Sequence, residues 1–337
     1  MNLDKVAFYN LGALEEIPGH GRNGLVRVPK NIRNKLNKRA RWVGMDSTGI
    51  EVRFVSDATV FDLYVSCLKP EFGNVGRIRV YCGHYLINTL EIEPGILRSY
   101  RIEKNARFNH INNNMLCFQG GFAPNVWRIV FERATFAIQG IDVFGYEMRP
   151  PKIEELPRLD WLAYGSSITN SNLDGYVHIA ASRLHTQVQN MGFSGACQIE
   201  KELIDYMFDN RTFDFVTMEL GINMRNAFTP DQFRERADYA IKRIVDMKKP
   251  AWIITIFPNW GSEKYTLEMT KESENEIRFN EILEELVKEI NCDSLHLIHG
   301  EDILTDVSGL RGDLVHPTEY GHAIMGMNLA NKLNNYI

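Results

Sequence analysis

The sequence has few cysteines, and none of them lies close to another in the chain. Its five cysteines are odd in number, widely separated and form no CxxC motif. Disulfide frameworks and zinc sites are built from cysteines at close, regular spacing, so the pattern disfavours both as the basis of the fold. It indicates reduced thiols in a cytoplasmic protein. The N-terminal residues also lack an apolar segment followed by a small-residue cleavage site, so we expect no secretory signal.

Two further absences narrow the function. No run approaches the roughly 18 apolar residues that a membrane-spanning helix requires, so no membrane partner is expected. The formal net charge is −5, whereas domains that bind the nucleic-acid backbone usually carry a basic excess, so no nucleic-acid partner is expected. We interpret the one local basic run as a solvated face rather than a binding patch. It comprises Arg33, Lys35, Lys38, Arg39 and Arg41.

The first half of the chain, residues 1–148, has the pattern of a β-sandwich. The chain has 337 residues, which is more than one hydrophobic core usually serves, so two domains are expected. Apolar and polar residues alternate at 50–54 and again at Phe61, Leu63 and Val65, as in strands with one buried face. Glycine-containing turns at 73–74, 94–95 and 120–121 separate such segments. Short strands with frequent turns favour a sandwich of two sheets.

A proline-rich and charged segment at 149–158 is the expected linker, and the pattern changes after it. In residues 159–337, short apolar strands alternate with helical segments, including 230–247 and 269–291. This alternation predicts an α/β domain in which helices cover both faces of a parallel sheet. The strands are expected at 159–164, 188–191, 213–219, 251–257 and 295–299. Active sites in such sheets lie at the carboxyl ends of the strands.

Small and polar residues follow the first three of these strands. Residues 165–169 (GSSIT) could form a tight turn that exposes a hydroxyl, or could simply cap a helix. The glycines of 190–195 permit a sharp turn whose N–H groups face a ligand, or a loop without chemistry. The amide of Asn223 could donate to an oxyanion or cap its own turn. Each signal alone leaves both interpretations open.

The acid–base pair is expected near the C-terminus. Asp313 precedes His316 by three residues, a spacing that lets the carboxylate bond the imidazole Nδ1 and leave Nε2 as a base. Pro317 biases His316 away from helix, so its ring can project from the loop before a helix at 318–335.

Taken together, these blocks resemble those of the SGNH (GDSL-like) hydrolase family over residues 159–335. In that register Ser167, not Ser166, is the nucleophile, and Gly195 and Asn223 match the oxyanion donors together with the N–H of Ser167. Asp313 and His316 match the Asp-x-x-His-Pro block. Ser166 stands where the family usually has aspartate. The resemblance implies a flavodoxin-like three-layer domain, and the first half is similar to the jelly-roll domain of some carbohydrate esterases.

The resemblance implies a serine esterase that needs no metal or organic cofactor. The absence of an apolar segment that could form a lid favours short acyl groups, acetyl in the first instance, with a small molecule or an oligosaccharide as the ester substrate. Trp260 follows the fourth strand, where it could line the substrate pocket or pack a loop. A lipid-ester or thioester substrate is the alternative within this class.

Two alternatives come from other classes. The histidines at 296, 299, 316 and 322 would suit a metal hydrolase, but residues i and i+3 of a strand point to opposite faces, which disfavours it. A sugar-binding protein with a vestigial hydrolase half is the other alternative. The aromatic residues Trp42, Tyr81 and Trp127 permit it, although aromatic side chains in a sandwich are more often core.

Overall fold

The computed structural model describes residues 3–71, 73–110, 120–171, 173–334 and 336. The chain divides into two compact units. The first comprises residues 1–30, 44–158 and 185–189, and the second comprises 31–43, 159–184 and 190–337. The domain boundary expected at 149–158 stays a prediction. The short segment 31–43, which lies far upstream of it, clusters with the second unit.

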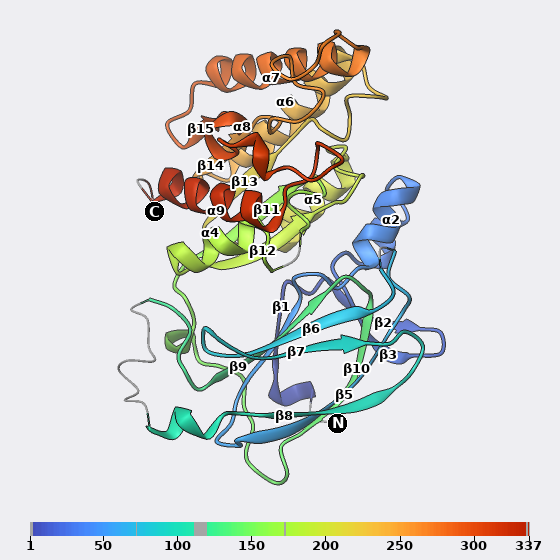
Figure 1. Cartoon of the computed structure of the whole chain (residues 1–337), viewed down its shortest axis with the longest axis vertical. Coiled ribbons are helices and arrows are strands. Elements are labelled where there is room, and N and C mark those ends of the chain that lie inside the picture. The colour runs from blue at the N-terminus through green and yellow to red at the C-terminus, as the bar shows by residue number, and fades with distance from the viewer. Residues whose placement is uncertain (1–2, 72, 111–119, 172, 335, 337) are drawn as a thin grey trace. The chain divides into compact units, whose positions relative to one another are not determined.

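The first unit contains two five-stranded antiparallel sheets, which confirms the β-sandwich (Figure 1). Their strand orders are β1-β4-β9-β6-β7 and β2-β3-β10-β5-β8. The strands are β1 (Ala7–Tyr9), β2 (Ala13–Ile17), β3 (Gly21–Val26), β4 (Glu51–Val55), β5 (Val60–Cys67), β6 (Gly76–Cys82), β7 (Tyr85–Ile92), β8 (Arg98–Glu103), β9 (Val126–Glu132) and β10 (Phe136–Asp142). Short helices α1 (Lys30–Arg33) and α2 (Lys38–Met45) connect β3 to β4.

Aromatic packing dominates the sandwich core. Trp127 is 1% exposed and contacts Phe54 and Phe61 at ring-centroid distances of 6.4 and 5.1 Å. Phe61, Leu63 and Val65 are fully buried on one face of β5, as their alternation predicts. Trp127 is therefore a core residue and has no surface with which to stack on a sugar.

Strand β4 differs from its prediction because both of its faces are buried. Its polar residues are ion-paired: Glu51 bonds the Arg53 Nε at 2.7 Å and the Arg128 Nη2 at 2.6 Å. Burial opposes ionisation of Glu51, but the two guanidinium groups outweigh it and hold its pKa far below the ordinary value. The alternation of apolar and polar residues correctly indicates a polar face of β4. That face is buried, and its charges are compensated by ion pairs rather than by solvent.

The second unit contains a five-stranded parallel sheet of order β12-β11-β13-β14-β15. This is the 2-1-3-4-5 order of flavodoxin-like sheets and confirms the predicted α/β class. Its strands are β11 (Asp160–Gly165), β12 (Gln187–Gly192), β13 (Phe215–Glu219), β14 (Ala251–Ile254) and β15 (Leu295–Ile298). Its helices are α4 (Tyr176–Leu184), α5 (Lys201–Asn210), α6 (Pro230–Asp246), α7 (Lys271–Ile290), α8 (Gly300–Ile303) and α9 (Glu319–Leu333).

The helices fall into two groups, one with α4 packed on α9 and the other with α6 between α5 and α7 (Figure 1). Their starts follow from local sequence. Thr229, Thr270 and Thr318 each accept a hydrogen bond from a backbone N–H of the first turn of α6, α7 and α9. These caps fix where each helix begins, and hence how long the loop after each strand is.

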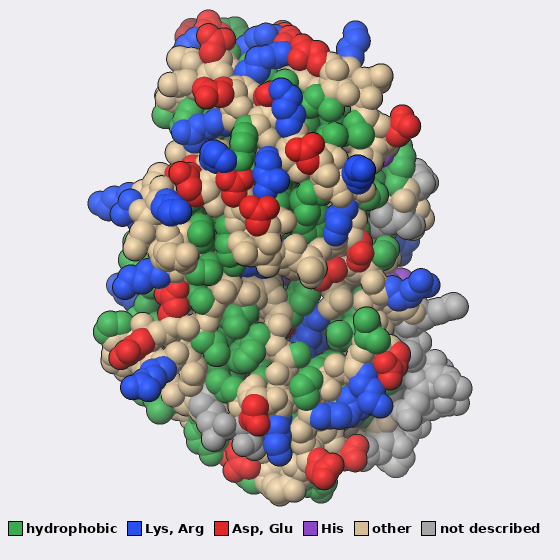
Figure 2. All heavy atoms as spheres, turned by 180° about the vertical axis from the view of Figure 1, so that it is seen from behind, with side chains coloured by type: hydrophobic (Ala, Val, Ile, Leu, Met, Phe, Trp, Pro, Cys, Tyr) green, Lys and Arg blue, Asp and Glu red, His purple; other side chains and the backbone are tan. Residues whose placement is uncertain are grey.

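Three further observations concern the surface charges, the thiols and the length of the helices. On the face shown in Figure 2, acidic and basic side chains are interspersed rather than gathered by sign. Cys67, Cys82, Cys197 and Cys292 are free thiols, and Cys117 lies outside the described residues. Within the part of the chain that the structure describes, no helix has the length and apolar character needed to cross a membrane.

Candidate active site

The turn after β11 presents two serines in different environments. Ser166 is fully buried, and its Oγ accepts a hydrogen bond from the Ile168 N–H at 3.2 Å. Ser167 is only partly buried, and its Oγ lies 2.8 Å from His316 Nε2. The hydroxyl that can meet both a substrate and a base is therefore that of Ser167.

The structure brings His316 and Asp313 together in the loop before α9. His316 Nδ1 lies 2.9 Å from Asp313 Oδ2, and Asp313 Oδ1 accepts the backbone N–H groups of Val315 and His316 at 3.0 and 2.9 Å. Partial burial opposes ionisation of Asp313, but these donors outweigh it and keep its pKa below the ordinary value. The ionised carboxylate of Asp313 can thus accept a hydrogen bond from the imidazole Nδ1 of His316.

Leu314 makes this tight turn possible. It adopts a left-handed conformation with φ of 57°, which is uncommon for a residue that is not glycine. Its carbonyl accepts the backbone N–H of Trp260 at 2.8 Å. Trp260 therefore lies against the acid–base loop, although sequence alone left its position open.

The loops after β12 and β13 carry Gly195 and Asn223, the residues that the sequence predicts as oxyanion donors. Gly195 has φ of +64°, a conformation that favours glycine, and a Cβ there would lie 2.7 Å from Arg39 Nε. Asn223 accepts the Cys197 N–H through Oδ1 at 3.1 Å. Because the carbonyl end of the amide is engaged in this way, its Nδ2 is the end left to donate. The hydrogen bond from Cys197 to Asn223 thus joins the two loops to each other.

Glu219 is a site residue that the sequence analysis missed. It ends β13 and is 1% exposed, and its Oε2 accepts the Ser166 N–H at 2.7 Å and the Thr169 Oγ1 at 3.1 Å. Burial raises its pKa to about 7, although the bonds from Ser166 and Thr169 lower it. A charged residue at the end of an otherwise apolar strand was the signal that could have identified it.

The upstream segment 31–43 also reaches this site, which no sequence signal indicated. Arg39 Nε donates to the Ser194 carbonyl at 3.0 Å, next to Gly195. Asn37 donates to Glu200 from its backbone N–H at 2.7 Å and from Nδ2 at 2.8 Å. Part of the basic run is therefore a support for the β12–α5 loop rather than a solvated face.

The histidines of the metal alternative do not converge. His296 packs against Trp252 and Tyr336, with ring centroids 5.3 and 4.6 Å away. His299 pairs with Glu284 at 3.6 Å. Among the residues that the structure describes, no group of three or more His, Cys, Asp and Glu could hold a metal ion.

Sheet order and loop residues together define the class. A serine after the first strand, a glycine after the second, an asparagine after the third and an Asp-x-x-His before the last helix are the features of an SGNH-type hydrolase fold. The model of the GDSL-like lipase/acylhydrolase family matches residues 161–334, slightly more than half of the chain. The chain belongs to this family, which makes it an ester hydrolase by class.

Several solved structures share the fold over nearly the whole chain. A salicylyl-acyltransferase from a tetracycline biosynthetic pathway has a TM-score of 0.80 at 11% identity, covering 98% of this chain and 94% of that one. A family two carbohydrate esterase from Clostridium thermocellum, in complex with cellohexaose, has a TM-score of 0.59 at 14% identity, covering 86% and 92%. An acetyl xylan esterase from Butyrivibrio proteoclasticus has 0.58 at 10%, covering 99% and 96%.

At such identities the likeness shows the fold alone. No curated protein sequence matches the chain significantly.

Proposed function

We propose that the chain hydrolyses esters with Ser167 as nucleophile, His316 as general base and Asp313 as the group that orients and stabilises the imidazole. The observation that carries the proposal is the continuous contact from Ser167 Oγ to His316 Nε2, 2.8 Å, and from His316 Nδ1 to Asp313 Oδ2, 2.9 Å. The first distance suits proton transfer from Ser167 to His316, and the second suits a hydrogen bond that holds the imidazole in place.

The reaction has two acyl-transfer steps. His316 Nε2 takes the Ser167 proton as Oγ bonds the ester carbon, and the same proton then passes to the leaving alcohol as its C–O bond breaks. Water next gives a proton to His316 and adds to the acyl carbon. His316 returns that proton to Ser167 Oγ as the acid leaves. No metal or organic cofactor takes part in these steps.

Negative charge develops on the carbonyl oxygen in both steps. The proposed donors to it are the backbone N–H groups of Ser167 and Gly195 and the side-chain Nδ2 of Asn223. Removing one such donor typically costs about 10²–10³ in kcat. We therefore expect Asn223→Ala to lower kcat by that factor with little change in KM. An effect confined to KM would instead make Asn223 a ground-state binder of substrate.

Labelling by a fluorophosphonate probe tests the nucleophile, because the probe reacts only with an activated serine. We expect the wild type and Ser166→Ala to be labelled and to hydrolyse phenyl acetate, and Ser167→Ala to do neither. Ser166→Ala is the matched control, since it removes a neighbouring hydroxyl. Equal loss in both folded variants would contradict the assignment of Ser167.

For the substrate, we propose a short acyl ester, acetyl in the first instance, carried by a carbohydrate or a small molecule. Two structural neighbours are named as a carbohydrate esterase and an acetyl xylan esterase, and this analogy supports the proposal. Trp260 is proposed to line the pocket, because its backbone bonds the acid–base loop at Leu314. Aromatic side chains commonly stack on sugar rings and aryl groups alike.

One observation favours a longer acyl chain instead. The loop after Trp260 exposes Tyr265, Leu267 and Met269, and Thr266 of this loop donates its hydroxyl hydrogen to the Trp260 carbonyl. The two proposals, a short and a long acyl chain, are separated by comparing kcat/KM for acetyl, butyryl and octanoyl aryl esters. Acetylated oligosaccharides are tested next. The short-chain proposal predicts the highest kcat/KM for acetyl esters. A preference for octanoyl would overturn it in favour of a lipid ester.

We further propose a cytoplasmic location, supported by the free thiols of the four described cysteines. Immunoblotting of subcellular fractions tests it. Recovery of the protein with a secreted or periplasmic marker would contradict it.

A further inference from the structure

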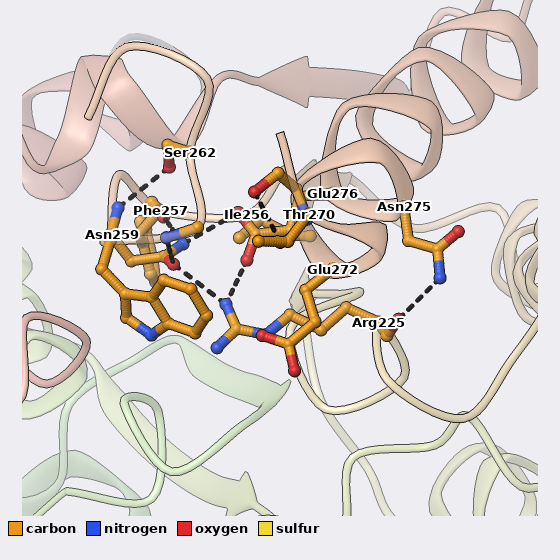
Figure 3. Close-up of polar contacts among 12 residues, drawn as sticks. Arg225, Ile256, Phe257, Asn259, Ser262, Thr270, Glu272, Asn275 and Glu276 are labelled. Atoms are coloured by element: carbon orange, nitrogen blue, oxygen red, sulfur yellow. Dashed lines mark hydrogen bonds and ion pairs between the residues drawn. The ribbon is translucent and has the colours of Figure 1, made fainter. Parts of the chain in front are cut away.

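Arg225 is a buried charged residue close to the proposed oxyanion donor. It lies two residues after Asn223 in the loop between β13 and α6, and it is 8% exposed. Its Nη1 donates to Asn259 Oδ1 at 2.9 Å and to Glu276 Oε1 (Figure 3). Its side chain therefore connects the Asn223 loop to the loop after β14 and to α7.

The same guanidinium group faces an aromatic ring. Its central carbon lies 5.2 Å from the ring centroid of Trp260, within the range of a cation–π contact. The backbone N–H of Trp260 in turn donates to the backbone carbonyl of Leu314 at 2.8 Å. Leu314 lies between Asp313 and His316. A continuous series of contacts thus runs from the oxyanion loop to the acid–base loop through Arg225 and Trp260.

This cluster has little freedom to shift. A Cβ at Gly261 would lie 2.7 Å from Glu276 Oε1 and 3.2 Å from Arg225 Nη1, so the backbone passes directly over the ion pair. Asn259 Nδ2 donates to Glu276 Oε2 at 3.1 Å, which holds the second carboxylate oxygen. The cluster therefore fixes the 257–262 loop, and with it Trp260.

Arg225 is poorly suited to bind an anionic substrate itself. Its Nη1 bonds Glu276, and its Nε lies 3.9 Å from Glu272 Oε2, so two carboxylates already surround one guanidinium group (Figure 3). The backbone carbonyl of Arg225 is also engaged, because it accepts Asn275 Nδ2 at 2.6 Å.

We propose that Arg225 is a positioning residue: through Trp260 it holds the Asp313–His316 turn in register with the Asn223 amide around Ser167. The inference rests on the proposed function. Its physical reason is that misplacing a catalytic group by about 1 Å can cost on the order of 10²-fold in rate. A planar guanidinium can bond Asn259 and Glu276 while it faces the Trp260 ring, and a lysine ammonium cannot do both.

The test is a double-mutant cycle with phenyl acetate as substrate. We expect Arg225→Lys to lower kcat by about 10-fold or more, with KM within about twofold of the wild type. In a Trp260→Ala background the same substitution should lower kcat by less than about threefold, because the indole ring that Arg225 faces is already absent. A structural role unrelated to Trp260 would give the same factor in both backgrounds, and that result would overturn the proposal.

Arg234→Lys is the matched control, because Arg234 also pairs with glutamates of α7, Glu285 and Glu289, but outside these loops. Its kcat should stay within about twofold of the wild type. Glu276→Gln carries the same cycle if Arg225→Lys does not fold. It removes the partner charge but keeps the side-chain shape.

Fluorophosphonate labelling distinguishes a failure of the positioning role from a failure of the proposed esterase function. A wild type that is labelled, with kcat of Arg225→Lys and Glu276→Gln unchanged, would refute the positioning role alone. A folded wild type that is not labelled would refute the proposed function itself.

Discussion

The buried carboxyl group of Glu219 should make the stability of the protein depend on pH. Its Oε2 accepts hydrogen bonds from Ser166 and Thr169, which are weaker compensation for a negative charge than a cation would be. Burial therefore raises its pKa from the ordinary 4.5 to about 7. The perturbation we choose is Glu219→Gln, because it keeps the shape and one carbonyl acceptor but cannot ionise.

The sign and size follow from this pKa. The folded state binds the proton more tightly than the unfolded state, so the stabilisation from neutral Glu219 is complete below pH 4.5 and is lost as pH rises through about 7. A pKa difference of about 2.5 corresponds to roughly 3 kcal/mol of unfolding free energy. The wild type should thus lose about 3 kcal/mol relative to Glu219→Gln between pH 4.5 and pH 8.

Urea unfolding followed by tryptophan fluorescence measures the effect, because Trp161 and Trp252 are buried in the same sheet as Glu219. The informative quantity is how the difference between variant and wild type changes with pH, since a constant cost of the buried amide cancels. Glu289→Gln is the control for the substitution itself, because it makes the same change in a side chain that is 58% exposed. A difference for Glu219→Gln that does not change with pH, or changes no more than that of the control, would refute the reasoning.

Three other predictions concern the cap of α2, the loop after β12 and the effect of a chelator on activity. Asn37→Ala removes the side chain that caps α2 at the Ala40 N–H and bonds Glu200, so we expect a loss of about 1–2 kcal/mol in unfolding free energy by urea titration. Gly195→Ala places a Cβ against Arg39 in a left-handed backbone conformation, so steady-state kinetics should show kcat reduced by at least about tenfold. Dialysis against a chelator should leave esterase activity unchanged, and a loss restored by a divalent metal would contradict the serine mechanism.

The parts of the fold that sequence predicted are those governed by local periodicity. Phe61, Leu63 and Val65 alternate because one face of β5 meets the sandwich core, and the helix expected at 269–291 is observed as Lys271–Ile290. The structure shows what sets its ends: Thr270 caps the start, and Asn291, at φ of 46°, takes the left-handed conformation at the end. Such signals lie within a few residues of the element that they define.

Predictions failed where burial is decided by distant parts of the chain. The strand expected at 251–257 ends at Ile254, because the following residues leave the sheet to form the loop that carries Asn259 and Trp260. The apolar run continues past the strand because Ile256 and Phe257 are also buried, at 5% and 2% exposed. Hydrophobicity thus reports burial, and burial alone does not distinguish a strand from a buried loop.

In the candidate site, too, contacts between residues close in sequence could be predicted, and contacts between distant residues could not. Asp313 and His316 could be paired from sequence because three residues separate them, and a turn of that length brings their side chains together. Arg39 and Ser194 are separated by 155 positions, so nothing local links them. A hydrolase of this design therefore shows its reacting groups in short blocks, whereas the side chains that hold those groups within an ångström are set by tertiary packing. Substitutions in such supports should lower kcat without touching any residue that a motif identifies.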